Sequence, residues 1–243
     1  MSYPLPQSDI EPMLMEREVH TSILDPNTGD NIILYSSTKI KVEELIGYFY
    51  EYNCNRLNGI RFWPGIMDYS LVFPIISVSS SAAESTAFCL LEETSYLSPE
   101  NSFSEIASRP LAMRCFAEYK SNVLIDGQNQ ASIVAIDSRF MEWTDMLLLL
   151  QANIPGFIET NPSTFTGYSI KIEQGYLSSE LAAKFYSQYG IGENNTDYIG
   201  YTVILSIYDR TGVPLINPAA PYVAGEYSGR YLEANKPCPP FCS

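Results

Sequence analysis

The sequence contains a single histidine, His20, among 243 residues. Serine-type triads, many zinc sites and most general bases use imidazole, because its pKa lies near neutrality. No catalytic signature surrounds His20 in the string Glu18-Val19-His20-Thr21. The sequence also lacks a P-loop and the motifs Gly-x-Gly-x-x-Gly, Gly-x-Ser-x-Gly and Cys-x-x-Cys. These absences remove the common signatures of several enzyme classes, so the sequence favours a protein that is not an enzyme.

Charge is scarce as well, and basic charge especially so. Charged residues make up 17% of the chain, and 14 basic against 28 acidic residues give a net charge of −14. Binding to phosphates requires clustered Lys and Arg, so nucleic acid and anionic membrane surfaces are excluded as expected partners. The simplest reading of the charge is solubility through self-repulsion, and the alternative is a basic partner or a cation-rich environment.

Long hydrophobic runs are missing. The longest are residues 71–76 and 146–150, far below the roughly 20 apolar residues that cross a bilayer. The first six residues have neither the basic region nor the apolar core of a secretory signal. We therefore expect a soluble protein located in the cytoplasm. With 46% hydrophobic residues, the chain can build a sizeable core.

The five cysteines are too few, and odd in number, to indicate a disulfide framework. Three of them stand in apolar surroundings, where a buried free thiol is the usual state. These are Cys54, Cys89 and Cys115.

The other two cysteines flank two prolines in Cys238-Pro239-Pro240-Phe241-Cys242. A residue before proline favours extended backbone, and an extended proline run rises about 3.1 Å per residue, which would hold the two cysteines about 12 Å apart. A disulfide needs Cα atoms within about 7 Å. We expect two free thiols in a structural tail with Phe241 buried. A disulfide, through a cis-proline or a tight turn, and a metal site with further ligands are the alternatives.

Short β-prone runs joined by turn residues are mixed with a few helical periods. Helices are expected at residues 40–58, 82–94, 138–152 and 178–190. Strands are expected at residues 21–24, 31–35, 60–63, 71–78, 111–119, 122–125, 132–136, 168–173, 201–208 and 213–216. Turns are expected at residues 25–30, 64–65, 126–127 and 209–212. Strict strand–helix alternation is absent, so we predict an α+β fold, a mainly antiparallel sheet with three to four helices in a single domain.

The composition divides the chain into three parts. Residues 1–17 are rich in Pro and show no sustained period, so we expect an N-terminal arm that is loose or laid over a neighbour. Residues 18–217 form the single α+β domain. Residues 218–243 are rich in Pro, Gly and Tyr and are expected to be an irregular tail packed on the domain.

The best candidate for a contact site is an aromatic string with charges at its ends. Trp and Arg are typical anchors of interfaces, so we predict a partner-binding loop here. Its residues are Arg61, Phe62, Trp63, Asp68 and Tyr69. The alternative is that Trp63 is buried and that Arg61 and Asp68 form an ion pair at the base of a loop.

Acidic residues offer the only candidate catalytic groups. Glu142 and Asp145 are three residues apart, and so share a face of the predicted helix. Paired carboxylates can act as acid and base where burial separates their pKa values. The alternative is that acids in a first helical turn complement the helix dipole. If the protein is an enzyme, we expect Asp68, Glu142 and Asp145 to carry the reaction.

Two polar strings place oxygen-bearing side chains close together, at residues 25–30 and 192–197. Neither has the length or the bidentate Glu of an EF-hand loop, so we interpret both as turns. We predict no metal site and no cofactor.

These observations favour a non-catalytic structural or interaction protein that self-associates. Its expected partners are itself, as a homo-oligomer, or another protein. Residues 61–69 and the tail from residue 218 are the expected contact surfaces. The alternatives are a carboxylate-dependent hydrolase and a small-ligand carrier with an aromatic pocket.

Overall fold

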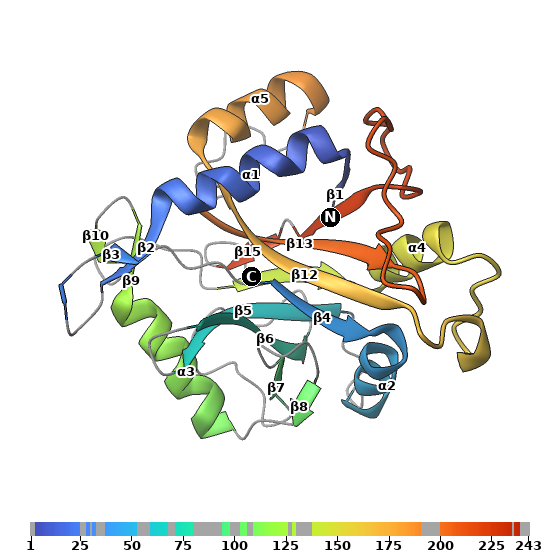
Figure 1. Cartoon of the computed structure of the whole chain (residues 1–243), viewed down its shortest axis with the longest axis horizontal. Helices are drawn as coiled ribbons and strands as arrows, with labels where there is room; N and C mark the ends of the chain where they lie inside the picture. Colours follow the sequence, from blue (N-terminus) through green and yellow to red (C-terminus); the bar gives the residue numbers. More distant parts are fainter. Residues whose placement is uncertain are drawn as a thin grey trace.

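The computed structural model describes residues 3–24, 28–29, 31–32, 37–52, 59–67, 71–79, 94–97, 103–105, 109–125, 128–129, 138–190, 200–234 and 236–238. Within these residues the chain forms an α+β fold with antiparallel sheets, which confirms the predicted fold class (Figure 1). The described part contains five α-helices, one more than the upper bound predicted.

The first of the two larger sheets has five strands. Its order is β1 (Tyr3–Leu5), β14 (Tyr231–Ala234), β13 (Gly200–Tyr208), β12 (Ser169–Leu177) and β4 (Ser37–Lys41). Strands β12 and β13 pair over their whole length, from Ser169↔Tyr208 to Leu177↔Gly200. The continuous register means that alternate residues of each strand face opposite sides of the sheet.

A six-stranded sheet faces it. Its order is β15 (Lys236–Cys238), β11 (Ser138–Glu142), β5 (Gly59–Met67), β6 (Leu71–Ser79), β7 (Thr94–Leu97) and β8 (Phe103–Glu105). A small four-stranded sheet contains β10 (Gln128–Asn129), β9 (Val123–Ile125), β2 (Thr21–Leu24) and β3 (Asn31–Ile32).

The main core lies between the two larger sheets. Ile172, Val203 and Leu205 of the five-stranded sheet are buried with Phe62 and Met141 of the six-stranded sheet. Helices α2 (Val42–Tyr52) and α4 (Trp143–Asn153) pack on the same core. Burial of these apolar side chains is the dominant source of the protein's stability.

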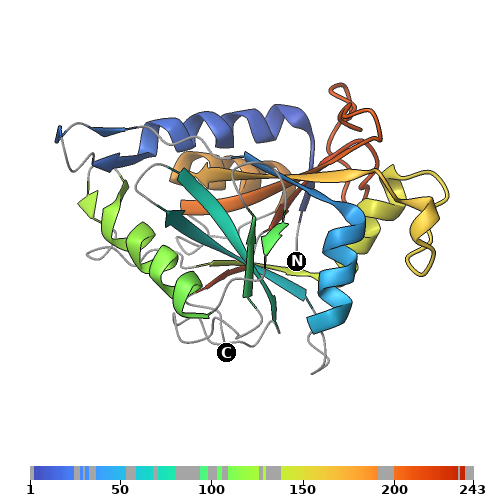
Figure 2. The ribbon, with the colours of Figure 1, turned by 60° about the horizontal axis from the view of Figure 1, so that its bottom comes forward.

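Helices cover the outer faces. Helix α1 (Gln7–His20) and helix α5 (Ser179–Tyr189) lie side by side on the outer face of the five-stranded sheet (Figure 1). Helix α3 (Arg109–Asn122) packs against β5 of the six-stranded sheet (Figure 2). None of the helices in the described residues is long and apolar enough to span a membrane.

Several local predictions are confirmed. Strands β2 and β3 pair antiparallel, with Ile23 opposite Ile32. Strand β9 falls within the strand expected at residues 122–125 and pairs antiparallel with β10, while residues 126–127 and the strand expected at 132–136 lie outside the described residues. Helix α5 begins after Ser178, whose hydroxyl accepts a hydrogen bond from the Leu181 N–H, and it ends at Gly190 in the left-handed conformation.

Helices α1 and α3 differ from the predictions. Residues 3–17, expected as an arm without a period, form β1 and most of α1. The inward face of α1 includes Asp9 and Arg17 beside Ile10 and Met13, so its apolar period is weak. The segment 111–119, expected as a strand, belongs to α3.

The period of α3 was present in the sequence and was missed. Its buried residues are Ala112, Cys115, Phe116 and Tyr119, which have the i, i+3, i+4, i+7 spacing of one helix face. Cys115 is buried as a reduced thiol, as predicted.

Two further segments also differ from the predictions. The helix expected from residue 138 begins only at Trp143, because residues 138–142 form β11 between two other strands. The expected turn at Pro64-Gly65 lies inside β5, with Pro64 opposite Pro74. Both prolines lie outside the stretches that pair with β11 and β7, so their missing N–H groups leave those ladders intact.

The end of the chain is more regular than expected, because it contributes β14 and β15. The expected helix at residues 82–94 lies outside the described residues except for Thr94, which begins strand β7. The polar string at residues 192–197 also lies outside them, as do Cys54, Cys89, Phe241 and Cys242.

Candidate functional site

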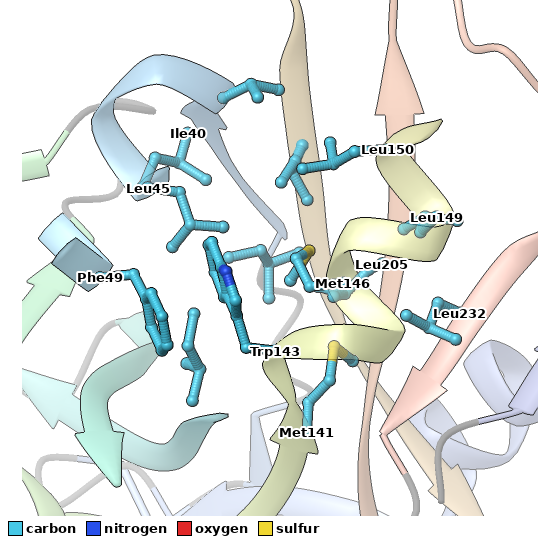
Figure 3. Close-up of a cluster of buried hydrophobic side chains, with 14 of the residues drawn as sticks. Ile40, Leu45, Phe49, Met141, Trp143, Met146, Leu149, Leu150, Leu205 and Leu232 are labelled. Carbon is cyan, nitrogen blue, oxygen red and sulfur yellow. The ribbon is translucent and has the colours of Figure 1, made fainter. Parts of the chain in front are cut away.

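Helix α4 packs one face on the main core and exposes the opposite face to solvent. Its inward side chains Trp143, Met146, Leu149 and Leu150 are buried. Figure 3 shows these four from α4 beside Leu45 and Phe49 of α2 and Leu205 and Leu232 of the five-stranded sheet. The Trp143 and Phe49 rings stack with centroids 3.8 Å apart and planes 5° apart. This contact joins α4 to α2.

The outward side of α4 carries no charge. Its exposed residues are Thr144, Leu148, Gln151 and Ala152. The sequence from residue 146 to residue 158 contains no Asp, Glu, Lys, Arg or His. An uncharged exposed helix face is unusual on a chain whose net charge is −14.

Residues 209–230 lie beside α4 and are held in one conformation by hydrogen bonds. The Asp209 carboxylate accepts hydrogen bonds from the N–H groups of Thr211 at 2.8 Å and Val213 at 2.9 Å. These bonds and the Thr211 hydroxyl hold the pKa of Asp209 below its usual value. The turn predicted at residues 209–212 is therefore built by one carboxylate.

A buried arginine fixes the far end of the same segment. The Arg230 guanidinium donates to the carbonyl oxygens of Pro221, Glu226 and Ser228, at 2.6 to 3.2 Å. It also contacts the Glu226 carboxylate at 3.7 Å. Because a guanidinium presents several donors in a rigid fork, one side chain orders three backbone carbonyls that have no strand or helix partner.

Exposed apolar side chains gather at this end of the molecule. Five of the eight large apolar side chains exposed in the described residues lie here, each 44% to 55% exposed. We call them the apolar end: Tyr50, Leu148, Ile158, Val213 and Val223. Figures 1 and 2 show their elements, α2, α4 and the segments after α4 and β13, together at one end. Single exposed apolar residues are ordinary, but a grouped set marks a contact surface.

One carboxylate, that of Glu159, links an aromatic side chain of α2 to one of α4. Glu159 Oε1 accepts a hydrogen bond from the Tyr50 hydroxyl and another, at 3.0 Å, from Trp143 Nε1. Burial and the neighbouring Glu159 raise the pKa of Tyr50 to about 12. The loop after α4 is thus fixed to α2.

Two of the three predicted catalytic carboxylates, Glu142 and Asp145, lie in the described residues. Glu142 ends β11 and precedes α4 without capping it through its side chain. Asp145 is buried and accepts a hydrogen bond from the Tyr227 hydroxyl at 3.2 Å. Burial first, then Asp145 and more weakly Glu142, raise the pKa of Tyr227 to about 12. Both carboxylates thus act on Tyr227, and Asp68 lies outside the described residues.

The predicted contact string is not an exposed cluster. Arg61, Phe62 and Trp63 lie in β5 with no exposed surface. Arg61 donates to Ser138 Oγ at 3.1 Å, and Trp63 Nε1 donates to Ser77 Oγ at 3.0 Å. The expected exposure is wrong because β5 is covered on both faces, by the main core and by α3. Asp68 and Tyr69 lie outside the described residues, so their binding role stays a prediction.

One signal for the apolar end is present in the sequence itself. The uncharged stretches 146–158 and 211–225 could have been read from the sequence. The hydrogen bonds between Asn153, in the first stretch, and Tyr227 and Gly229, just after the second, could not, because they form only in the folded chain. In the described residues, no group of three or more His, Cys, Asp or Glu side chains is placed to hold a metal ion.

Comparisons with known proteins add no relative. No protein-family model, no curated protein and no solved structure matches this chain.

Proposed function

We propose that this chain is a non-catalytic interaction protein that self-associates through the apolar end. The observation that carries the proposal is that four exposed apolar side chains come from two stretches without charged residues, 146–158 and 211–225, on a chain with net charge −14: Leu148, Ile158, Val213 and Val223. Burial of apolar surface is the main driving force of association. Arg230 orders the carbonyls of Pro221, Glu226 and Ser228, which reduces the entropy that binding must overcome in this part of the chain.

Electrostatics restrict where two copies can meet. Two copies repel each other over most of their surfaces, because each carries a net charge of −14. Contact between two uncharged faces keeps the carboxylates of both copies in water, away from the interface. Interfaces with a core depleted of charge follow the same logic.

The sheet edges support this choice of surface. Strands β1 and β15 are edge strands of three residues, and each has a proline at its centre, Pro4 and Pro237. Edge strand β4 carries Lys39 and Lys41. Short edges with proline or lysine disfavour the addition of a strand from another chain. Strand addition at these three edges is therefore disfavoured.

The test measures mass against concentration by light scattering and sedimentation velocity. We expect wild-type protein to exceed its monomer mass of 27.2 kDa at micromolar concentration. Higher salt should strengthen association, because it screens the repulsion. Leu148→Glu and Ile158→Glu should each return the protein to the monomer, while Val19→Glu, which adds the same charge at an exposed site on α1, should not. A wild-type monomer at every concentration and salt level would refute the proposal.

The hydrolase alternative is separated by one variant. Asp145→Asn keeps the shape of the side chain and removes its charge. If the protein hydrolyses any ester or glycoside in a substrate screen and Asp145→Asn abolishes that activity, the non-catalytic proposal is wrong.

A further inference from the structure

Helix α1 presents a second kind of surface, on the outer side of the five-stranded sheet (Figure 1). Its inward residues include Ile10, Met13 and Arg17. Its exposed residues are Ser8, Glu11, Met15, Glu18 and Val19. These positions follow the i, i+3, i+7, i+10 and i+11 spacing of one stripe along a helix. We call it the α1 stripe.

The α1 stripe has two apolar anchors. Met15 is 68% exposed and Val19 is 78% exposed, the two highest values among the large apolar side chains of the described residues. They are four residues apart and so stand one turn apart on the same face. Helix-binding surfaces use anchors at this spacing, and methionine adapts to varied partners.

Carboxylates flank the two anchors. Glu11 and Glu18 are exposed one turn away on either side, and Glu180 is exposed at the start of the neighbouring helix α5. Gln7 donates to Glu11 at 2.6 Å and Arg17 contacts Glu18 at 3.5 Å, while Glu18 still exposes 53% of its side chain.

The nearby cations each contact a carboxylate or a backbone carbonyl of the fold. Arg17 is buried and donates to the Gln174 carbonyl at 2.8 Å, as well as contacting Glu18. Lys184 of α5 reaches the buried Asp9 at 3.4 Å, and His20 reaches Glu16 at 3.0 Å. The exposed charge of the stripe itself is therefore acidic, with apolar side chains between the acids.

We propose that the α1 stripe is a docking site for a basic amphipathic helix of a partner protein. The partner's apolar side chains would cover Met15 and Val19, and its Lys or Arg side chains would meet Glu11 and Glu18. Two helix ridges can interlock in this way, and opposite charge at the rim speeds encounter and fixes orientation. The net charge of −14 attracts such a segment over a longer range. This site is separate from the self-association surface.

The probe is an 18-residue amphipathic helix built from Leu and Lys, measured by fluorescence anisotropy against the full chain. A peptide of the same composition with its Leu and Lys scrambled, so that no apolar face forms, serves as the ligand control. We expect the amphipathic peptide to bind and the scrambled peptide to bind on the order of tenfold more weakly.

Two double variants test the two parts of the stripe. Met15→Ser with Val19→Ser removes the anchors, and Glu11→Lys with Glu18→Lys reverses the charge. Each double variant should bind the amphipathic peptide on the order of tenfold more weakly than wild type does. The control Glu44→Lys with Glu51→Lys on α2 changes the net charge equally and should weaken it much less. Equal loss in both charge variants, or equal binding by both peptides, would overturn the proposal, because binding would then follow net charge alone.

Discussion

Asn153 and Tyr227 are 74 residues apart in the sequence, yet Asn153 Nδ2 donates a hydrogen bond to the Tyr227 carbonyl at 3.0 Å. The same side chain accepts a hydrogen bond from the Gly229 N–H at 2.8 Å. One amide at the last residue of α4 thus fixes the irregular segment that follows β13. This link holds the C-terminal end of α4 beside residues 227–229.

Asn153→Ala should destabilise the protein by about 1 to 3 kcal/mol, because it leaves a partly buried N–H and carbonyl without their partner. Urea unfolding followed by circular dichroism measures the change. Gln151→Ala, on the exposed side of the same helix, is the control and should change stability by less than about 0.5 kcal/mol. Equal effects for the two variants would show that Asn153 does not hold the segment.

Two buried tyrosines should respond in opposite ways to loss of the hydroxyl. The Tyr201 hydroxyl is fully buried and has no hydrogen-bond partner in the part of the chain that the structure describes. Tyr201→Phe should leave stability unchanged or raise it by up to about 1 kcal/mol, since it removes an unpaired polar group. Tyr227→Phe should lower stability by about 1 to 3 kcal/mol, because Asp145 loses its donor.

Thermal unfolding of the two tyrosine variants beside wild type decides the matter. A melting temperature that falls for Tyr201→Phe as much as for Tyr227→Phe would show that the Tyr201 hydroxyl is satisfied in solution.

Asp209 should make stability depend on acid pH. Hydrogen bonds from Val213 and Thr211 lower its pKa in the folded state relative to about 3.9 in the unfolded chain. A lowered folded pKa favours the fold above the unfolded pKa, and this contribution disappears as the pH falls through the folded value. Asp209→Ala should therefore be less stable than wild type at pH 7, with a gap that closes in strong acid.

The Asp209 experiment compares urea midpoints of wild type and Asp209→Ala from pH 7 down to pH 2. Glu51→Ala removes an exposed acid elsewhere and corrects for the change in net charge. A gap that stays constant over the whole range would contradict a role for the ionised carboxylate.

The sequence by itself determined the local features whose cause lies within a few residues. Ser178 and Gly190 bound α5 because a hydroxyl cap and a left-handed glycine act within one turn. The β-branched and aromatic run after Gly200 forms β13, and Asp209 turns the chain after it. The α+β class followed from the mixture of such signals.

Only the tertiary structure decided what is buried and what is brought together. Residues 138–142 form a strand because β5 and β15 flank them, although their own pattern continues into α4. Trp63 resembled an exposed anchor, but α3 covers it. The apolar end and the α1 stripe exist because long-range packing buries one side of a helix and leaves the other in water, and no local residue pattern specifies which distant segment does the covering.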